Sequence, residues 1–493
     1  MVAVPHGLPG TPEYLSRLRY AWRVCSVTSL GLVLIGIAGS TLNVALPVVV
    51  RHFSATSLES TAILLAFLLV NTATLVFFGR IADLMGRREV YLAGFALFTA
   101  ASLAAGLAPN VGFLIAMRVL QAIGSSMILA NGTVIITDAF PPDRLSQGMG
   151  VYIGTLSVAQ LVGPTLGGLI AETWGWQWIF WVNVPAGLLA LVWGLLTLRK
   201  VARGPRRSID ALGNALVFAA LTALLLALSA AGSNGLDSPV VITGGIVFAV
   251  LLPLLVLVER RAEHPVLDPR LFGGRMLTYA NLASFCNALA RSALILVVAL
   301  YFQAAREMDA FSAGMSVLPV PVGMAIASPI SGWLGRWVSP YLLSVGGALF
   351  SVAGLGMLMV SVSPATPYWV IAVGLFLAGC GSGTFLTGNT TQVMSALPAE
   401  SLGVVNGFRL MIMNAGGVLS VGLSLTVLTS TVSPEIRAQV YSATLARLSP
   451  VAVEHLMDGF QHTYTVLFGV ALAGVLFAVM ARQRAARPAS RSH

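Results

Sequence analysis

Runs of about twenty apolar residues recur along the whole chain, and this feature restricts the fold more than any other. A helix of about twenty residues crosses the ~30 Å hydrocarbon core of a bilayer. Lipid offers no partner for free backbone groups, and the runs are continuous, so each run is expected to be a helix and a β-barrel is excluded. Only 9% of the residues are charged and the mean hydropathy is +0.87. The sequence therefore predicts an all-α integral membrane protein.

We expect fourteen membrane helices, divided into two six-helix bundles and an inserted pair. The predicted spans are residues 25–50, 60–79, 90–108, 111–136, 148–171, 179–198, 212–232, 239–258, 277–303, 313–334, 341–361, 368–395, 403–430 and 462–481. The predicted segments are a cytoplasmic stretch at 1–24, an N-terminal bundle at 25–198, an inserted pair with basic flanking loops at 199–275, a C-terminal bundle at 276–481 with an extracellular loop at 431–461, and a basic tail at 482–493.

The distribution of basic residues predicts the orientation. Most of the 28 Lys and Arg residues fall on one side of the membrane if the N-terminus is cytoplasmic, so both termini are expected in the cytoplasm. Topology accounts for the net charge of +10, and no nucleic-acid partner is needed to explain it. Lys200 is the single lysine, a bias that suggests a GC-rich bacterial genome. We expect a monomer in the bacterial cytoplasmic membrane, with the lipid bilayer and a small-molecule substrate as its partners.

A short charged loop joins the second and third expected helices. It contains Gly79, Arg80, Asp83, Gly86, Arg87 and Arg88. The two glycines permit close backbone approach, the Arg pair cannot cross the bilayer, and Asp83 offers it a counter-charge. The sequence predicts a compact hinge at the cytoplasmic face.

The fifth expected helix carries small residues and a proline: Gly154 and, after eight intervening residues, Gly163, Pro164, Gly167 and Gly168. Proline removes a backbone hydrogen bond and bends a helix, and small residues let a neighbouring helix pack closely. This combination predicts a bendable helix suited to rocking motions. Ordinary close packing is the alternative interpretation.

Both stretches resemble signatures of the major facilitator superfamily. The charged loop resembles the family's loop between helices 2 and 3, and the fifth helix resembles the signature of its proton-driven exporters. Further stretches extend the resemblance to the fourteen-helix drug:proton antiporters over nearly the whole chain: NVALP at 43–47, WQWIFWVNVPAG at 176–187, DALG at 210–213 and ERRAEHPVLDPRLF at 259–272. The resemblance implies two bundles that rock about a central cavity. It also implies that Asp83 meets the N-terminus of a second-half helix, where the dipole is positive, and that Arg87 and Arg88 clamp the same seam.

Three arginines fall inside expected helices, where a charge costs at least ~2.5–3.5 kcal/mol at the bilayer centre. Arg118 and Gln121 resemble the family's Arg-x-x-Gln signature, which is linked to proton transfer. Arg118 and Arg409 lie near helix ends, so snorkelling is an alternative for both. Arg291 lies near mid-membrane and is expected to face a cavity, the alternative being a structural Arg bonded to carbonyls. The predicted substrate-cavity residues are Asn43, Asn287, Arg291, Arg409 and Asn414.

No Asp, Glu or His falls inside the expected helices, and Ala38 stands where the family's first-helix signature has an acid. A lipophilic cation would meet Arg side chains and be repelled, so we expect a neutral or anionic amphipathic substrate. Arginine does not release protons readily. A proton path would therefore need Asp83, an interfacial Glu or a proton on the substrate. No metal or cofactor is expected, and the transmembrane proton gradient is the expected energy source.

These observations predict a secondary active transporter that exports small amphipathic compounds by proton antiport. The alternative is a lipid or lipid-linked glycan translocase on the same fold, which would show a lateral apolar opening between helices 5 and 10. A membrane enzyme is not expected, because the loops offer no cluster of acids or histidines for catalysis.

Overall fold

The computed structural model describes residues 9–200, 211–234, 238–261, 274–361, 363, 365–431 and 450–482. These residues form helices, turns and short loops, with no β-strand among them. Eleven helices in this part of the chain are long and apolar enough to cross a membrane, and Pro239–Leu255 is a shorter apolar helix. The all-helical prediction is confirmed, while the count of fourteen stays a prediction. Most of both basic loops, much of the extracellular loop and the tail lie outside the described residues.

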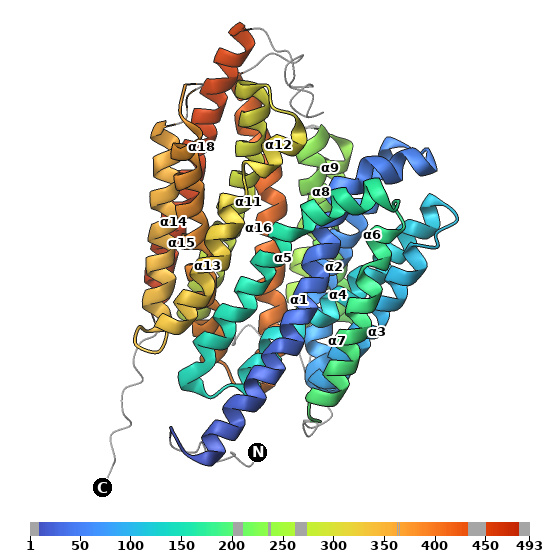
Figure 1. Ribbon diagram of the computed structural model, residues 1–493, viewed down its shortest axis with the longest axis vertical. Helices are drawn as coiled ribbons and strands as arrows, with labels where there is room; N and C mark the ends of the chain where they lie inside the picture. Colours follow the sequence, from blue (N-terminus) through green and yellow to red (C-terminus); the bar gives the residue numbers. More distant parts are fainter. Residues whose placement is uncertain are drawn as a thin grey trace.

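The first half of the chain forms one bundle, coloured blue to green in Figure 1. Its helices are α1 (Pro12–Phe53), α2 (Ser57–Met85), α3 (Arg87–Ala105), α4 (Val111–Ala139), α5 (Leu145–Thr173), the short α6 (Trp178–Trp181) and α7 (Asn183–Thr197). Helix α1 packs along α5, and α4 packs against both α2 and α3. A core of aliphatic and aromatic side chains lies within this bundle, and a larger buried cluster extends from the bundle into the second half.

The second half forms another bundle, coloured yellow to red in Figure 1. Its helices are α11 (Arg275–Arg306), the short α12 (Ala310–Met315), α13 (Pro319–Leu334), α14 (Pro340–Ser361), α15 (Tyr368–Ser395), α16 (Leu402–Leu428) and α18 (Pro450–Met480). Helix α15 packs on α13 and α14, and α11 packs on α16 and α18. The inserted helices α8 (Ala211–Asn234) and α9 (Pro239–Arg261) pack on each other, and α8 contacts α2 and α16, one helix from each bundle.

Several helices extend beyond the apolar runs that predict them. Helix α1 is continuous from Pro12, where the Thr11 side chain caps it, so it begins well before the first expected span at residue 25. Helix α18 begins at Pro450, and its first turns rise above the neighbouring helices in Figure 1. Asp458 therefore lies in a span that is apolar enough to cross a membrane. His462 lies there too and already opens the expected span 462–481. The expectation of helices free of acids and histidines is wrong there. Backbone hydrogen bonding continues a helix past the end of its apolar stretch.

The two halves meet along a seam, which we define as the surface where α2 contacts α16 and α5 contacts α13. One end of the molecule contains Asp83, near the end of α2, and is called the Asp83 end below. The first turn of α1 lies at this end, because the Tyr14 hydroxyl donates to Asp143 before α5. The last residues of α18 lie there as well, because Gln392 near the end of α15 donates to the Ala481 carbonyl.

Candidate functional site

Glycines bring the backbones of the two halves into direct contact along the seam. A β-carbon at Gly79 of α2 would lie 2.3 Å from the carbonyl oxygen of Gly403 in α16. A β-carbon at Gly150 of α5 would lie 2.5 Å from the carbonyl oxygen of Ser328 in α13. Neither distance is compatible with a side chain unless the helices move apart. Small residues therefore determine how closely the halves approach.

The seam is closed at the Asp83 end, and toward the other end α5 carries exposed side chains. Along α5, contact with α13 begins where Gly335 faces Ser146 and continues to Gly154, whose β-carbon would lie 3.0 Å from the ring of Pro329. Beyond Gly154 the α5 side chains become exposed, with Val158 at 47%, Val162 at 40% and Leu169 at 59%. On the other side of the seam, the Asn414 amide of α16 donates to the Thr72 hydroxyl of α2 over 3.0 Å.

Asp83 links the two halves at the closed end. Its side chain is 5% exposed and lies 3.0 Å from the Arg87 guanidinium. Its other carboxylate oxygen accepts a hydrogen bond from the backbone N–H of Val404, 3.4 Å away, in the first turn of α16. Arg87 also pairs with Asp138 of α4 and donates to the Ala399 carbonyl of the second half. A negative charge at the N-terminus of α16 is favoured by the helix dipole.

The remaining residues of the charged loop hold the first half together. Burial lowers the pKa of the Arg87 guanidinium, but Asp138 and Asp83 raise it by more, so its pKa lies above the ordinary value. Gly86 ends α2 with φ +112°, a conformation that favours glycine. Arg88 donates to the carbonyls of Leu198 and Leu195 at the end of α7. The expectation that Arg88 clamps the seam is therefore wrong, because the end of α7 supplies free carbonyls closer to it.

Arg80, the other basic residue of the loop, lies half-buried near the end of α2, one turn before Asp83. The small residues of α5 divide between two partners. Gly154 faces α13 across the seam, whereas Gly163 and Gly167 face α1 of the same half. A β-carbon at Gly163 would lie 1.7 Å from the Ser40 hydroxyl oxygen. Pro164 and Gly168 lie within α5, and their surroundings are outside the described part of the structure.

Arg118 lies inside the first bundle, where two of its guanidinium nitrogens donate hydrogen bonds. The residue is 2% exposed. Its guanidinium donates to the Gln121 side chain over 2.9 Å and to the Ile63 carbonyl over 3.4 Å, and it stacks on the Phe67 ring at 4.3 Å. Gln121 in turn donates to the Ser102 hydroxyl over 2.7 Å. The snorkelling alternative is wrong for Arg118, because these partners hold it in the bundle interior.

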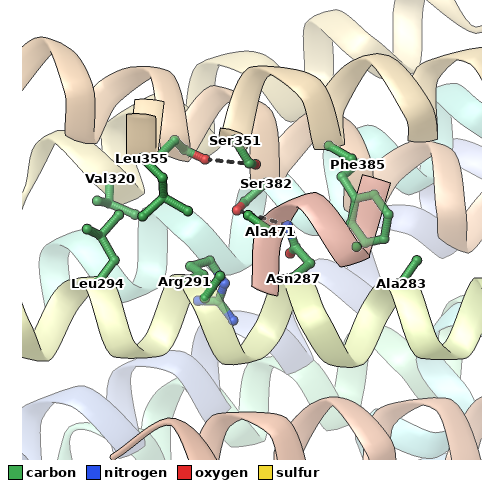
Figure 2. Close-up of a pocket in the computed structure, with 14 residues that line it drawn as sticks. Ala283, Asn287, Arg291, Leu294, Val320, Ser351, Leu355, Ser382, Phe385 and Ala471 are labelled. Atoms are coloured by element: carbon green, nitrogen blue, oxygen red, sulfur yellow. Dashed lines mark hydrogen bonds between the residues drawn. The ribbon is translucent and has the colours of Figure 1, made fainter. Parts of the chain in front are cut away.

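Arg291 lies near the middle of α11, beside a small cavity in the second bundle. Figure 2 shows Asn287 one turn away, pointing toward Ser382, to which its amide donates over 3.3 Å. The cavity measures about 20 Å³, which is room for about one water molecule. The Arg291 guanidinium points away from Ser382 in Figure 2, and its Nε has no partner among the described residues. The structure therefore lends no support to the alternative of a carbonyl-bonded structural Arg.

Arg409 lies in the closed part of the seam and is 3% exposed. Its guanidinium donates to the Thr390 hydroxyl over 3.0 Å and to the Asn406 side-chain oxygen over 3.3 Å, while its Nε has no partner. Asn406 also crosses the seam, because its amide donates to the Ala130 carbonyl of α4 over 2.9 Å. Snorkelling is wrong for Arg409 as well. Asn43 lies in α1, and its side chain is outside the described residues.

The structure thus brings Asp83 and Arg87 together with α16, and it separates Arg118, Arg291 and Arg409 into three different surroundings. Sequence reasoning missed Asn406 and Thr390 around Arg409, and it missed the glycines at 150 and 403. Asn406 stands three residues before Arg409, a spacing that puts both on one helix face and could have indicated a pair. Among the described residues, no cluster of His, Cys, Asp or Glu is arranged to hold a metal ion.

Comparisons with known proteins agree on one family. The sequence model of the Major Facilitator Superfamily matches residues 28–421. The multidrug resistance protein Stp of Mycobacterium tuberculosis is 32% identical over 83% of this chain and 76% of its own length. The riboflavin transporter RibZ of Clostridioides difficile is 27% identical over 80% and 86%, and the methylenomycin A resistance protein of Streptomyces coelicolor is 29% identical over 81% and 84%.

Solved structures show the same fold. The human organic anion transporter MFSD10 superposes with a TM-score of 0.63 at 16% identity, covering 93% of this chain and 99% of that one. The proton:xylose symporter XylE superposes with a TM-score of 0.63 at 14% identity, covering 94% and 95%. At these identities the likeness concerns the fold alone.

Proposed function

Because this chain belongs to the major facilitator superfamily and is a multi-span membrane transporter, we propose that it exports small amphipathic compounds by alternating access. The observation that carries this proposal is the asymmetry of the seam. At the Asp83 end, the backbones of Gly79 and Gly403 touch and Asp83 binds α16, whereas the α5 side chains Val158, Val162 and Leu169 beyond Gly154 are exposed. With the Asp83 end taken as cytoplasmic, this arrangement is an outward-facing state.

The substrate is neutral or anionic. Arg291 lies near the middle of α11 and Arg409 lies in the closed part of the seam, and neither has a carboxylate within 4.0 Å among the described residues. A lipophilic cation that approached them would be repelled, whereas an anion would gain charge-assisted hydrogen bonds. The relatives named for multidrug resistance, methylenomycin A resistance and riboflavin transport support small organic compounds as substrates. They do not favour the lipid or lipid-linked glycan translocase.

The transmembrane proton gradient drives this export in our proposal. Arg118 and Gln121 form a bonded network with no acid in it, and Arg keeps its proton at any working pH. The proton is therefore carried by Asp83, by an interfacial Glu or by the substrate itself. The protein acts as a monomer in the bacterial cytoplasmic membrane, with both termini in the cytoplasm.

A transport assay in inside-out proteoliposomes tests the proposal. Three amphiphiles of one alkyl chain length, with a carboxylate, an amide or a quaternary ammonium head, are offered with an imposed pH gradient. We expect gradient-dependent uptake of the carboxylate and amide probes, and collapse of that uptake with a protonophore. Vesicles containing Asp83→Asn protein are the matched comparison. Uptake of the ammonium probe alone would refute the charge argument, and uptake that ignores the protonophore would refute proton coupling.

A further inference from the structure

Among the described residues of the closed seam, Arg409 is the most buried cation. Helix α16 begins at Leu402, and Val404 in its first turn binds Asp83. Arg409 follows five residues later, which places it about 7.5 Å further along the helix axis. Helices α4 and α5 of the first half contact α15 and α16 of the second half in this region. Arg409 thus lies directly behind the contact that closes the Asp83 end.

The closed state does not satisfy the Arg409 guanidinium. A guanidinium offers five N–H donors and is charged at any working pH. Its acceptors here are the neutral oxygens of Thr390 and Asn406 and the sulfur of Met413, while Nε has none. A buried charge without a counter-ion costs several kcal/mol. An anion that reached this site would supply the missing partner.

Opening of the seam would expose this guanidinium. Asn406 is held by the Ala130 carbonyl of α4 across the seam. The titratable group facing Arg409 from α5 is the buried Tyr152, which interacts with it electrostatically. Ala130 and Tyr152 both belong to the first half, so a rocking motion that parts the halves moves both away from Asn406 and Arg409 together. Arg409, Asn406 and Thr390 stay behind as a group on α15 and α16, open to the cytoplasmic cavity.

We propose that Arg409, with Asn406 and Thr390, binds the anionic group of the substrate when the Asp83 end opens. The group is a carboxylate, sulfonate or phosphate attached to an apolar body. This inference rests on the proposed export function and locates the point at which the substrate's charge is recognised. When the seam closes again, Asn406 returns to the Ala130 carbonyl, and the anion loses its binding site on the cytoplasmic side.

A binding titration with matched fluorescent probes tests the site. Purified full-length protein in neutral detergent at pH 8 is titrated with dansylaminoundecanoate and with its uncharged methyl ester. We expect the carboxylate to bind the unaltered protein at least tenfold more tightly than the ester, because charge-assisted hydrogen bonds are the strong ones. In Arg409→Gln the two affinities should become equal while ester affinity stays unchanged. A preference that survives Arg409→Gln would overturn the proposal.

Two further variants separate recognition from folding. Arg409→Lys keeps the charge and should keep part of the carboxylate preference, which a merely structural role would not predict. Arg306→Gln is the matched control, because Arg306 at the end of α11 donates to the Thr366 carbonyl far from the site. It should keep the full preference. Loss of preference in Arg306→Gln to the same degree as in Arg409→Gln would overturn the assignment to Arg409.

A cross-link tests whether the site is hidden in the closed seam. A β-carbon at Gly335 would lie 2.5 Å from that of Ser146 across the seam, so Ser146→Cys with Gly335→Cys can bridge α13 and α5 after a small shift. The three native cysteines are replaced by Ser. Oxidation should abolish the carboxylate preference and reduction should restore it. A preference that persists in the oxidised protein would overturn the location.

Further measurements identify the source of the anion and distinguish failure of the anion site from failure of the proposed export function. One outcome is that inorganic phosphate or phosphatidylglycerol competes for the site better than the carboxylate probe does, and only when Arg409 is present. That result would assign the site to a free anion or a lipid and would overturn the substrate assignment. Ester export that continues in Arg409→Gln proteoliposomes, with the preference also retained, would reject the anion site alone. Absence of any export by the unaltered protein would reject the proposed function instead.

Discussion

Gly79→Ala should drive the protein away from the state in which the Asp83 end is closed. The added β-carbon would lie 2.3 Å from the Gly403 carbonyl oxygen and 2.7 Å from its carbonyl carbon, and ordinary contact begins at 3.4 Å. Both atoms belong to the backbone, so α2 and α16 must separate by about 1 Å to accept the methyl group. Overpacking of this kind costs about 1–3 kcal/mol. If that cost falls on the closed state alone, the ratio of open to closed molecules rises about 5- to 150-fold.

Distance measurements between spin labels can detect this shift. Met85 at the end of α2 and Trp337 after α13 are 56% and 62% exposed and belong to opposite halves at the Asp83 end. Labels on cysteines at these positions, in a background without the native cysteines, should report a longer distance in Gly79→Ala. Gly346→Ala in α14 is the matched control, because a β-carbon there meets nothing within 4 Å. If both variants give the same distances as the parent, the contact at Gly79 does not control the seam.

Three further predictions concern residues of the first half. Asp83→Asn removes the charge that binds Arg87 and the α16 N-terminus, so transport should fall about tenfold or more while membrane insertion stays normal; near-normal transport in a vesicle assay would discard this role. Arg88→Ala loses two hydrogen bonds to the end of α7, about 1 kcal/mol each. The unfolding temperature should therefore fall by a few degrees, while the preference for the carboxylate probe over the ester stays unchanged. A change in that preference would contradict a capping role for Arg88. Gly163→Ala should destabilise the protein by about 1–3 kcal/mol. Adding Ser40→Ala should recover part of that loss in a double-mutant cycle, because the Ser40 hydroxyl oxygen is the atom closest to the new β-carbon. No recovery would locate the clash elsewhere.

The residues that form the closed end show how far motif reasoning reaches. Asp83 was predicted to meet the N-terminus of a second-half helix, and it lies 3.4 Å from the Val404 N–H. The resemblance to the family supplied that expectation, because the charged-loop motif implies a definite partner for its Asp, the N-terminus of a second-half helix. Arg88 was assigned to the same seam and lies instead at the end of α7. Adjacent residues on a helix point about 100° apart, so two neighbouring arginines rarely serve one partner.

What the sequence alone determined is the helical membrane architecture, because about twenty apolar residues in lipid can satisfy their backbone only as a helix. It also determined where charges interrupt that pattern. The tertiary structure decided which of those charges remain unpaired and which glycines touch. Gly79 and Gly403, or Asn406 and Ala130, are hundreds of residues apart, and nothing local in either segment specifies the other. Their contact depends on how two whole bundles dock, and docking is the property that alternating access changes.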